Sequence, residues 1–184
     1  MVAIGVTGHR FLGEPERLEA ALDDVVARLA RERPEAWTIL SALAEGADRL
    51  LTNHLLRRTG TRLLAVLPLP VDVYEADFGS PASRAQFRDL LGRAVEVVTL
   101  PPQADRDRAY EAAGLAILDR SDVLVAVWDG AVEHGVGGTG AVVAEARERD
   151  LPLVWLHAGN RRPGTEEPTS LADAQGLVTW EGFG

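Results

Sequence analysis

The chain has 184 residues, of which 46% are hydrophobic and 26% are charged, and it contains no cysteine. All 19 of its Lys and Arg positions are arginine, which excludes a P-loop that uses the Walker A lysine and any Schiff-base lysine. The absence of cysteine excludes disulfides, thiol nucleophiles and cysteine-ligated metals. The net charge of −9 disfavours a general nucleic-acid-binding surface, because basic residues supply most of the affinity for a phosphate backbone.

The length of the chain favours a single domain with one substantial core. No apolar run reaches the ~18 residues that span a bilayer, and the first residues lack the positive region of a signal peptide. We therefore expect a cytoplasmic protein without membrane contact. We expect no metal, because no set of His, Asp and Glu has a recognised metal-ligand spacing, and no cofactor.

Short apolar runs alternate with longer amphipathic segments along the chain. The apolar runs predict strands at residues 2–7, 37–40, 62–67, 96–100, 122–128 and 151–156. Apolar residues at spacings of three and four predict a helix that begins near Pro15 and four more at 46–59, 83–93, 105–120 and 141–149. Residues 71–82 are predicted to be irregular. The tail from Gly159 reads as a Gly/Pro-rich surface extension, in which residues 177–180 either remain loop or add an edge strand.

This alternation predicts an α/β fold. Strands that alternate with helices form βαβ units, and near-continuous apolar strands are typical of a parallel sheet covered on both faces. We expect one Rossmann-like domain over residues 1–184, with a mostly parallel sheet of about six to seven strands and helices on both faces.

Three loops that follow predicted strands carry residue types that bind small ligands. In an open parallel sheet, ligands lie beyond the carboxyl ends of the strands, near the point where the strand order reverses. The first loop contains Gly8, His9 and Arg10. Glycine permits close backbone approach, and the arginine fork binds phosphate or carboxylate. The alternative is that Gly8 only makes the turn and Arg10 faces solvent.

The second loop runs from Ser41 through Glu45 and Gly46 to Asp48, and it joins a strand end to a helix start. Free backbone N–H groups and the helix dipole favour an anion at such a place. We expect Ser41 and Gly46 to serve that role. Asp48 either bonds a ribose hydroxyl or caps the helix.

The third loop has four glycines in the six residues 135–140, directly before a predicted helix. This pattern is typical of a loop whose backbone amides cradle a phosphate, although glycines also serve flexibility alone. The candidate ligand-binding residues of this region are Trp128, Asp129, Gly137, Gly138 and Thr139.

Four segments together form a recognisable pattern: VTGHR at 6–10, SALAEGADRL at 41–50, SDVLVAVWDG at 121–130 and GGTGAVVAEA at 137–146. In their order and spacing they resemble the SLOG superfamily, which includes the DprA-type proteins, the Lonely Guy phosphoribohydrolases and the YpsA-like proteins. The resemblance covers about residues 1–157. It implies a Rossmann-like domain that binds a nucleotide or nucleotide-derived ligand, with the phosphate on residues 135–140 and helix N-termini. We also expect a homodimer. The single-stranded DNA binding of DprA-type proteins is not expected at this net charge, with 5% aromatic residues.

The resemblance leaves an enzymatic alternative open. Lonely Guy enzymes cleave the N-glycosidic bond of a nucleoside monophosphate, and their signature has a glutamate three residues after a threonine. Here Val142 holds that position, and Glu145 lies six residues after Thr139. We therefore predict ligand binding first, nucleotide hydrolysis second and a scaffold with an unused pocket third. A carboxylate near the ribose stabilises an oxocarbenium-like transition state, and the candidates are Glu45, Asp48, Asp129 and Glu145.

Overall fold

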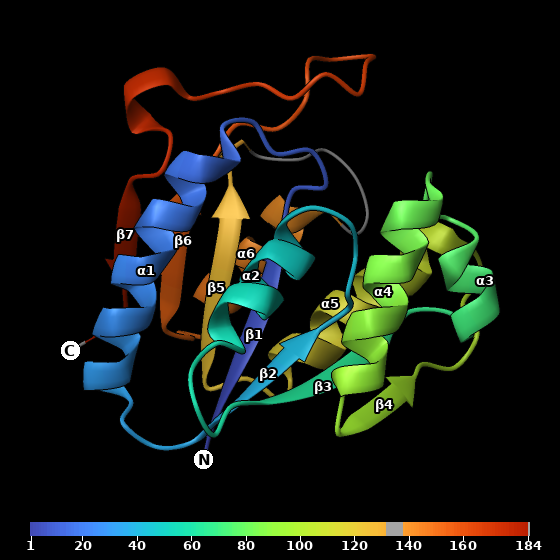
Figure 1. Cartoon of the computed structure of the whole chain (residues 1–184), viewed down its shortest axis with the longest axis horizontal. Coiled ribbons are helices and arrows are strands. Elements are labelled where there is room, and N and C mark those ends of the chain that lie inside the picture. The colour runs from blue at the N-terminus through green and yellow to red at the C-terminus, as the bar shows by residue number, and fades with distance from the viewer. Residues whose placement is uncertain (132–137, 184) are drawn as a thin grey trace.

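The computed structural model of the chain describes residues 1–131 and 138–183. They form an α/β domain in which a seven-stranded sheet carries helices on both faces (Figure 1). The strands are β1 (Val2–Gly8), β2 (Trp37–Ser41), β3 (Arg62–Leu67), β4 (Glu96–Thr99), β5 (Val123–Trp128), β6 (Leu153–His157) and β7 (Val178–Glu181). The helices are α1 (Pro15–Glu32), α2 (Ala47–Leu55), α3 (Val71–Glu75), α4 (Pro81–Arg93), α5 (Arg106–Leu118) and α6 (Thr139–Glu148), with a 3₁₀ turn at Ala172–Ala174.

The strand order is β4-β3-β2-β1-β5-β6-β7, and every neighbouring pair is parallel except β6 with the antiparallel β7. The chain builds β2, β3 and β4 on one side of β1 and then crosses to β5 on the other side. The switch point therefore lies between β1 and β5, where a ligand site is expected. The predicted Rossmann-like α/β fold is confirmed, and β7 shows that residues 178–181 add the edge strand.

The central strand β5 explains why its sequence is apolar without interruption. Val123, Val125 and Val127 lie in one core cluster with residues of α1, α2 and α4. Leu124, Ala126 and Trp128 lie in a second cluster with residues of α5 and α6. Both faces of the strand are buried, so the alternation of a half-buried strand is absent.

The prediction of an irregular segment at 71–82 was wrong, because α3 occupies Val71–Glu75 and α4 begins at Pro81. Proline at the first helical position favours this start, and the Ser80 hydroxyl caps α4 by accepting a 3.1 Å hydrogen bond from the Ser83 N–H. Residues 71–78, which we call the α3 segment, are held by aromatic packing, with the ring centres of Tyr74 and Phe87 5.7 Å apart. The Asp, Gly and Pro residues of this stretch are typical of loops, so its sequence does not indicate this packing.

After β6 the chain crosses the carboxyl end of the sheet, at the top of Figure 1, before it returns in β7. This extension is docked onto the start of α1: the Ser170 hydroxyl donates a 2.6 Å hydrogen bond to Glu14, and Arg17 donates one of 2.9 Å to the Ala172 carbonyl. None of the helices that the structure describes is long and apolar enough to cross a membrane.

Candidate functional site

A cavity of about 280 Å³ lies at the carboxyl end of β1, beside the switch point. We call it the main cavity. Its walls come from β1, the second loop, the α3 segment, α5 and the start of α6. The lining residues are Val6, Thr7, Gly8, Arg10, Ala42, Ala44, Glu45, Asp48, Tyr74, Asp77, Phe78, Tyr110, Ala113, Gly114, Ile117, Thr139 and Val142.

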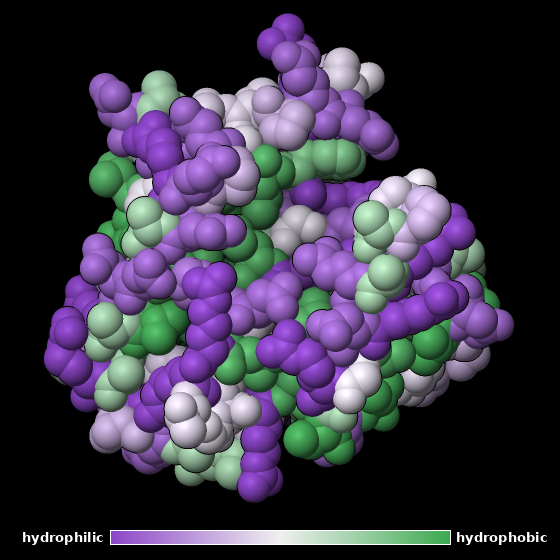
Figure 2. Space-filling model, in the orientation of Figure 1, coloured by the Kyte–Doolittle hydropathy of each residue, from purple (hydrophilic) through white to green (hydrophobic). Residues whose placement is uncertain are grey.

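A second hollow of about 290 Å³, which we call the outer cleft, adjoins the main cavity. It is lined by Gly8, His9, Arg10, Phe11, Gly138, Thr139, Asn160 and Arg161. Gly8, Arg10 and Thr139 line both hollows, so the two adjoin along a shared wall. Figure 2 shows the surface hollowed between the C-terminal extension at the top and the α3–α4 part of the molecule at the right.

Gly8 is required by the close packing at the switch point. A Cβ atom at this position would lie 2.5 Å from both the Ala47 Cβ and the Val127 carbonyl oxygen. Gly46 is constrained in a similar way, because its φ is +83° and a Cβ there would lie 2.2 Å from the Arg10 carbonyl oxygen. Both glycines therefore let the first and second loops approach each other.

His9 is buried and connects the loops of the site through hydrogen bonds. The residue is 3% exposed. The Asp129 N–H donates a 3.0 Å hydrogen bond to its Nε2 atom, and the His9 carbonyl accepts a 3.0 Å hydrogen bond from the Ala47 N–H. The side chain ties the end of β5 to the first loop, and the backbone ties the first loop to α2.

Arg10 is held by an ion pair with Glu45 at the mouth of the main cavity. The Ser83 hydroxyl of α4 donates a hydrogen bond to the same carboxylate. Burial raises the pKa of Glu45, but the hydrogen bonds from Ser83 and Arg10 together lower it by more than burial raises it. The pKa of Glu45 therefore lies below the ordinary value. Glu45 is therefore ionised at neutral pH, and it fixes the Arg10 guanidinium between the two hollows.

Asp48 lies in the first turn of α2 and lines the main cavity, with 6% of the residue exposed. Burial raises the pKa of its carboxyl to about 7, against smaller lowering effects of the Ala44 N–H and the Arg49 guanidinium. Glu45 and Asp48 thus line one cavity with pKa values that are shifted in opposite directions.

The α3 and α5 walls of the main cavity meet at Asp77. Its carboxylate accepts a 2.5 Å hydrogen bond from the Tyr110 hydroxyl and one of 2.7 Å from Arg106. Burial, together with the bond to Asp77, raises the pKa of Tyr110 to about 12. The tyrosine therefore stays protonated and keeps donating at any physiological pH.

The second loop uses its own polar groups internally. Ser41 is fully buried and accepts a 3.0 Å hydrogen bond from the Leu43 N–H. The Ala44 N–H donates to Asp48 at 3.4 Å, and the first amide of α2, Ala47, donates to His9. The amide groups of Leu43, Ala44 and Ala47 are thus engaged within the protein. Ser41 and Gly46 line neither hollow.

The structure separates several other predicted site residues from the two hollows. Trp128 is 4% exposed and packs on Trp155 with ring centres 5.1 Å apart. The Asp129 carboxylate accepts a 2.9 Å hydrogen bond from the Ala131 N–H, and Glu145 pairs with Arg149 at 2.7 Å. Trp128, Asp129 and Glu145 line neither hollow. Gly137 and the rest of segment 132–137 lie outside the described residues.

Most of the residues that line the two hollows were not predicted from the sequence. Tyr74, Asp77 and Phe78 come from the segment predicted to be irregular, and Tyr110 comes from the predicted helix 105–120, in which no site residue was predicted. The usable signal was the pair of aromatic residues Tyr74 and Phe78 in the segment between β3 and α4. Asn160 and Arg161 come from the extension, which gave no such signal.

No protein-family model matches the chain, and no curated protein matches it. Among solved structures, TM1055 from a structural genomics project is 16% identical, with a TM-score of 0.48 over 83% of this chain and 72% of that chain. A structure of the Moco carrier protein from Chlamydomonas reinhardtii is 22% identical, with a TM-score of 0.49 over 84% and 75% of the two chains. A second structure of that protein is 18% identical, with a TM-score of 0.43 over 84% and 74%.

Proposed function

We propose that this chain is a SLOG-type domain that binds a nucleotide or a nucleotide-derived small molecule. The observation that carries the proposal is that the main cavity and the outer cleft adjoin at the switch point, where both are lined by Gly8, Arg10 and Thr139. A ligand with an apolar ring and an attached phosphate matches such a two-part site.

The main cavity suits the ring of the ligand. Tyr74, Phe78 and Tyr110 supply aromatic surface, and Ile117 and Val142 supply aliphatic surface. Small-molecule sites are typically apolar with a few placed polar groups and begin at roughly 300 Å³, which is close to the size of this cavity. Asp48, whose carboxyl has a pKa of about 7, offers the ring one hydrogen-bond donor when it is protonated.

The start of α6 suits the phosphate. Gly138 is the N-cap of this ten-residue helix, and Thr139 is its first residue. The unpaired N–H groups of a helix start and the helix dipole favour an anion. Arg10 lines the same place from the opposite loop. The glycines at 135 and 137, which were expected to complete the phosphate loop, stay a prediction.

Thermal-shift and calorimetric titration with nucleoside mono- and diphosphates, cyclic nucleotides and NAD derivatives tests the proposal. We expect at least one of these compounds to stabilise the protein. Arg10→Ala and Thr139→Ala are expected to weaken its binding at least tenfold, since each removes a group that faces the phosphate. Arg120→Ala is the matched control, because Arg120 is exposed and precedes β5 at the amino end of the sheet. A flat response across the panel would refute ligand binding.

The opposite pKa shifts of Glu45 and Asp48 favour a second candidate, N-glycosidic cleavage of a nucleoside monophosphate. Two carboxyl groups in one cavity, one ionised and one protonated near pH 7, have the states required of a stabilising carboxylate and a general acid. Of the four carboxylates considered from the sequence, these two line the cavity.

Release of free base from AMP, GMP, CMP and UMP distinguishes the two candidates. An enzyme of this kind would release base, and Glu45→Gln and Asp48→Asn would each lower kcat by two or more orders of magnitude. Glu145→Gln is the control, because Glu145 pairs with Arg149 away from the cavity. Binding without release after prolonged incubation would leave the chain a binding domain.

A further inference from the structure

The C-terminal extension is built to lie close against the first loop. The side chain of Gln175, which is 2% exposed, donates a 2.8 Å hydrogen bond to the Gly13 carbonyl and accepts one of 2.9 Å from the Gly159 N–H. A Cβ atom at Gly13 or Gly159 would lie 2.5 or 2.4 Å from the Thr169 carbonyl oxygen. Only glycine permits this approach at both positions, so the extension has a defined place beside the site.

This docking brings Asn160 and Arg161 into the wall of the outer cleft. The guanidinium carbon of Arg161 lies 5.2 Å from the centre of the Phe11 ring, and that of Arg10 lies 5.6 Å from the same ring. One aromatic side chain therefore holds two arginines from distant parts of the sequence near each other.

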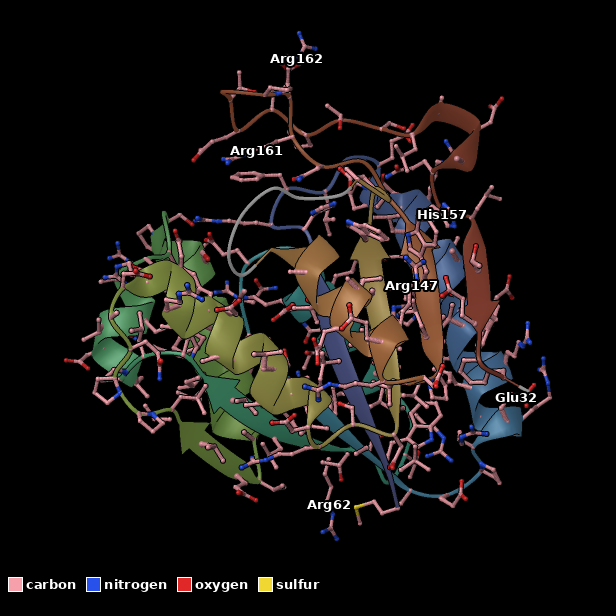
Figure 3. All side chains as sticks on the ribbon, turned by 180° about the vertical axis from the view of Figure 1, so that it is seen from behind. Glu32, Arg62, Arg147, His157, Arg161 and Arg162 are labelled. Carbon is pink, nitrogen blue, oxygen red and sulfur yellow. The ribbon has the colours of Figure 1, made fainter. Side chains whose placement is uncertain are left out.

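The neighbouring arginine of the extension is placed differently. Arg162 pairs with Glu167 at 3.2 Å. Figure 3 shows Arg162 pointing away from the body of the protein and Arg161 lying on the side that faces it. Arg161 forms no salt bridge with any residue in 1–131 or 138–183. The side chains of Arg161 and Arg162 thus point in different directions, and of the two only Arg162 is in an ion pair with a described residue.

Among residues 1–131 and 138–183, the outer cleft has more positive charge than its neighbours balance. None of its eight described lining residues is acidic, and Glu45 pairs with Arg10 but not with Arg161. Thr139 is 9% exposed and faces both hollows, and its hydroxyl makes no hydrogen bond with a described residue. One cleft thus holds a hydroxyl and a guanidinium that have no hydrogen-bonding or ionic partner among the described residues, and both groups suit an anionic ligand.

We propose that Arg161, assisted by the Asn160 amide, binds the distal phosphate of a ligand that carries two or more linked phosphate groups. The inference rests on the proposed function, in which the phosphate nearest the ring lies at Thr139 and Arg10. Arg161 approaches the cleft from the extension, on the side away from the main cavity. Its planar fork matches the oxygens of a second phosphate, and the preferred ligand is a nucleoside diphosphate or a derivative of one rather than a monophosphate.

Calorimetric titration of the full chain with the pairs AMP and ADP, GMP and GDP, CMP and CDP, and UMP and UDP, at one fixed ionic strength, tests this inference. For the base that binds, we expect the diphosphate to bind at least tenfold more tightly than the monophosphate. Arg161→Ala is expected to weaken diphosphate binding at least tenfold and to change monophosphate binding less than twofold. Arg162→Ala, the adjacent matched control, is expected to change neither.

Arg161→Gln separates the charge from the packing on Phe11, because glutamine keeps much of the aliphatic stem. The inference requires Arg161→Gln to lose the diphosphate preference as Arg161→Ala does. Equal binding of mono- and diphosphate by the wild type, or identical behaviour of the Arg161 and Arg162 variants, would overturn the inference and leave the proposed function standing. Absence of binding to every compound in the wider panel would overturn both.

Discussion

The Tyr110 hydroxyl donates a 2.5 Å hydrogen bond to the Asp77 carboxylate, and this contact joins α5 to the end of the α3 segment at the mouth of the main cavity. Arg106, one turn earlier in α5, binds the same carboxylate at 2.7 Å. Two residues of one helix therefore fix the wall that supplies Tyr74 and Phe78 to the cavity. The shape of the cavity depends on this junction as much as on the sheet.

Replacing Tyr110 with phenylalanine removes the hydroxyl and keeps the ring. We expect the free energy of unfolding to fall by about 1 kcal/mol, the usual worth of one hydrogen bond, because Arg106 still satisfies Asp77. Urea denaturation measures the change. Tyr74→Phe is the matched control, since the Tyr74 hydroxyl makes no hydrogen bond with a described residue. Equal losses in both variants would contradict the assigned role of the Tyr110 hydroxyl.

The raised pKa of Asp48 predicts that the free energy of unfolding depends on pH. The pKa of its carboxyl is about 7 in the folded protein and has an ordinary value of 3.8, so the folded state keeps a proton that the unfolded chain releases between those values. Stability therefore falls as pH rises through this window, by up to roughly 4 kcal/mol at about 1.4 kcal/mol per pKa unit. Below pH 3.8 the carboxyl is protonated in both states and this loss of stability is absent. Above pH 7 the carboxyl is ionised in both states and the loss is complete.

The Asp48→Asn variant isolates this effect, since asparagine keeps the shape of the side chain and does not titrate. We expect the variant to be more stable than the wild type at pH 8 and its advantage to shrink toward pH 4, as followed by urea denaturation at a series of pH values. Asp107→Asn is the control, because Asp107 is an exposed acid in the first turn of α5. A difference that does not vary with pH would show that Asp48 is not protonated in the folded state.

Gly8→Ala is expected to destabilise the fold by about 1–3 kcal/mol, the usual cost of overpacking a tight site. The added methyl would meet the Val127 carbonyl oxygen at 2.5 Å, and backbone atoms move less readily than a flexible side chain. Chemical denaturation measures the loss. Gly79→Ala gives the comparison, because its added Cβ would have no atom within 4 Å and is expected to leave stability nearly unchanged.

Gln175→Leu is expected to release the extension from the first loop. The variant loses the bonds to Gly13 and Gly159 while it keeps a side chain of similar size. Hydrogen exchange should show faster exchange of the Gly159 amide and of residues 168–176, with the exchange of β5 unchanged. Gln103→Leu is the matched control, since Gln103 is exposed and bonds only the nearby Pro101 carbonyl. Unchanged protection of the extension would show that other contacts suffice to hold it.

The sequence predicted those features that repeat along the chain or follow directly from a strand. The apolar runs located six of the strands, and the rule for parallel sheets indicated the edge of the sheet at which the main cavity lies. The roles of single residues were harder to predict, because Ser41 and Trp128 are the last residues of strands yet are buried. Tyr110 and Arg161 reach the site through tertiary packing, which no local pattern records.

The two hollows share a wall that is formed by Gly8, Arg10 and Thr139, and this shared wall has a thermodynamic consequence. A nucleoside in the main cavity and a free phosphate or pyrophosphate in the outer cleft would both act on the orientation of Arg10. Each fragment then changes the affinity of the other, and the two coupling factors must be equal. If both fragments favour the same orientation of Arg10, they bind cooperatively even though no covalent bond joins them.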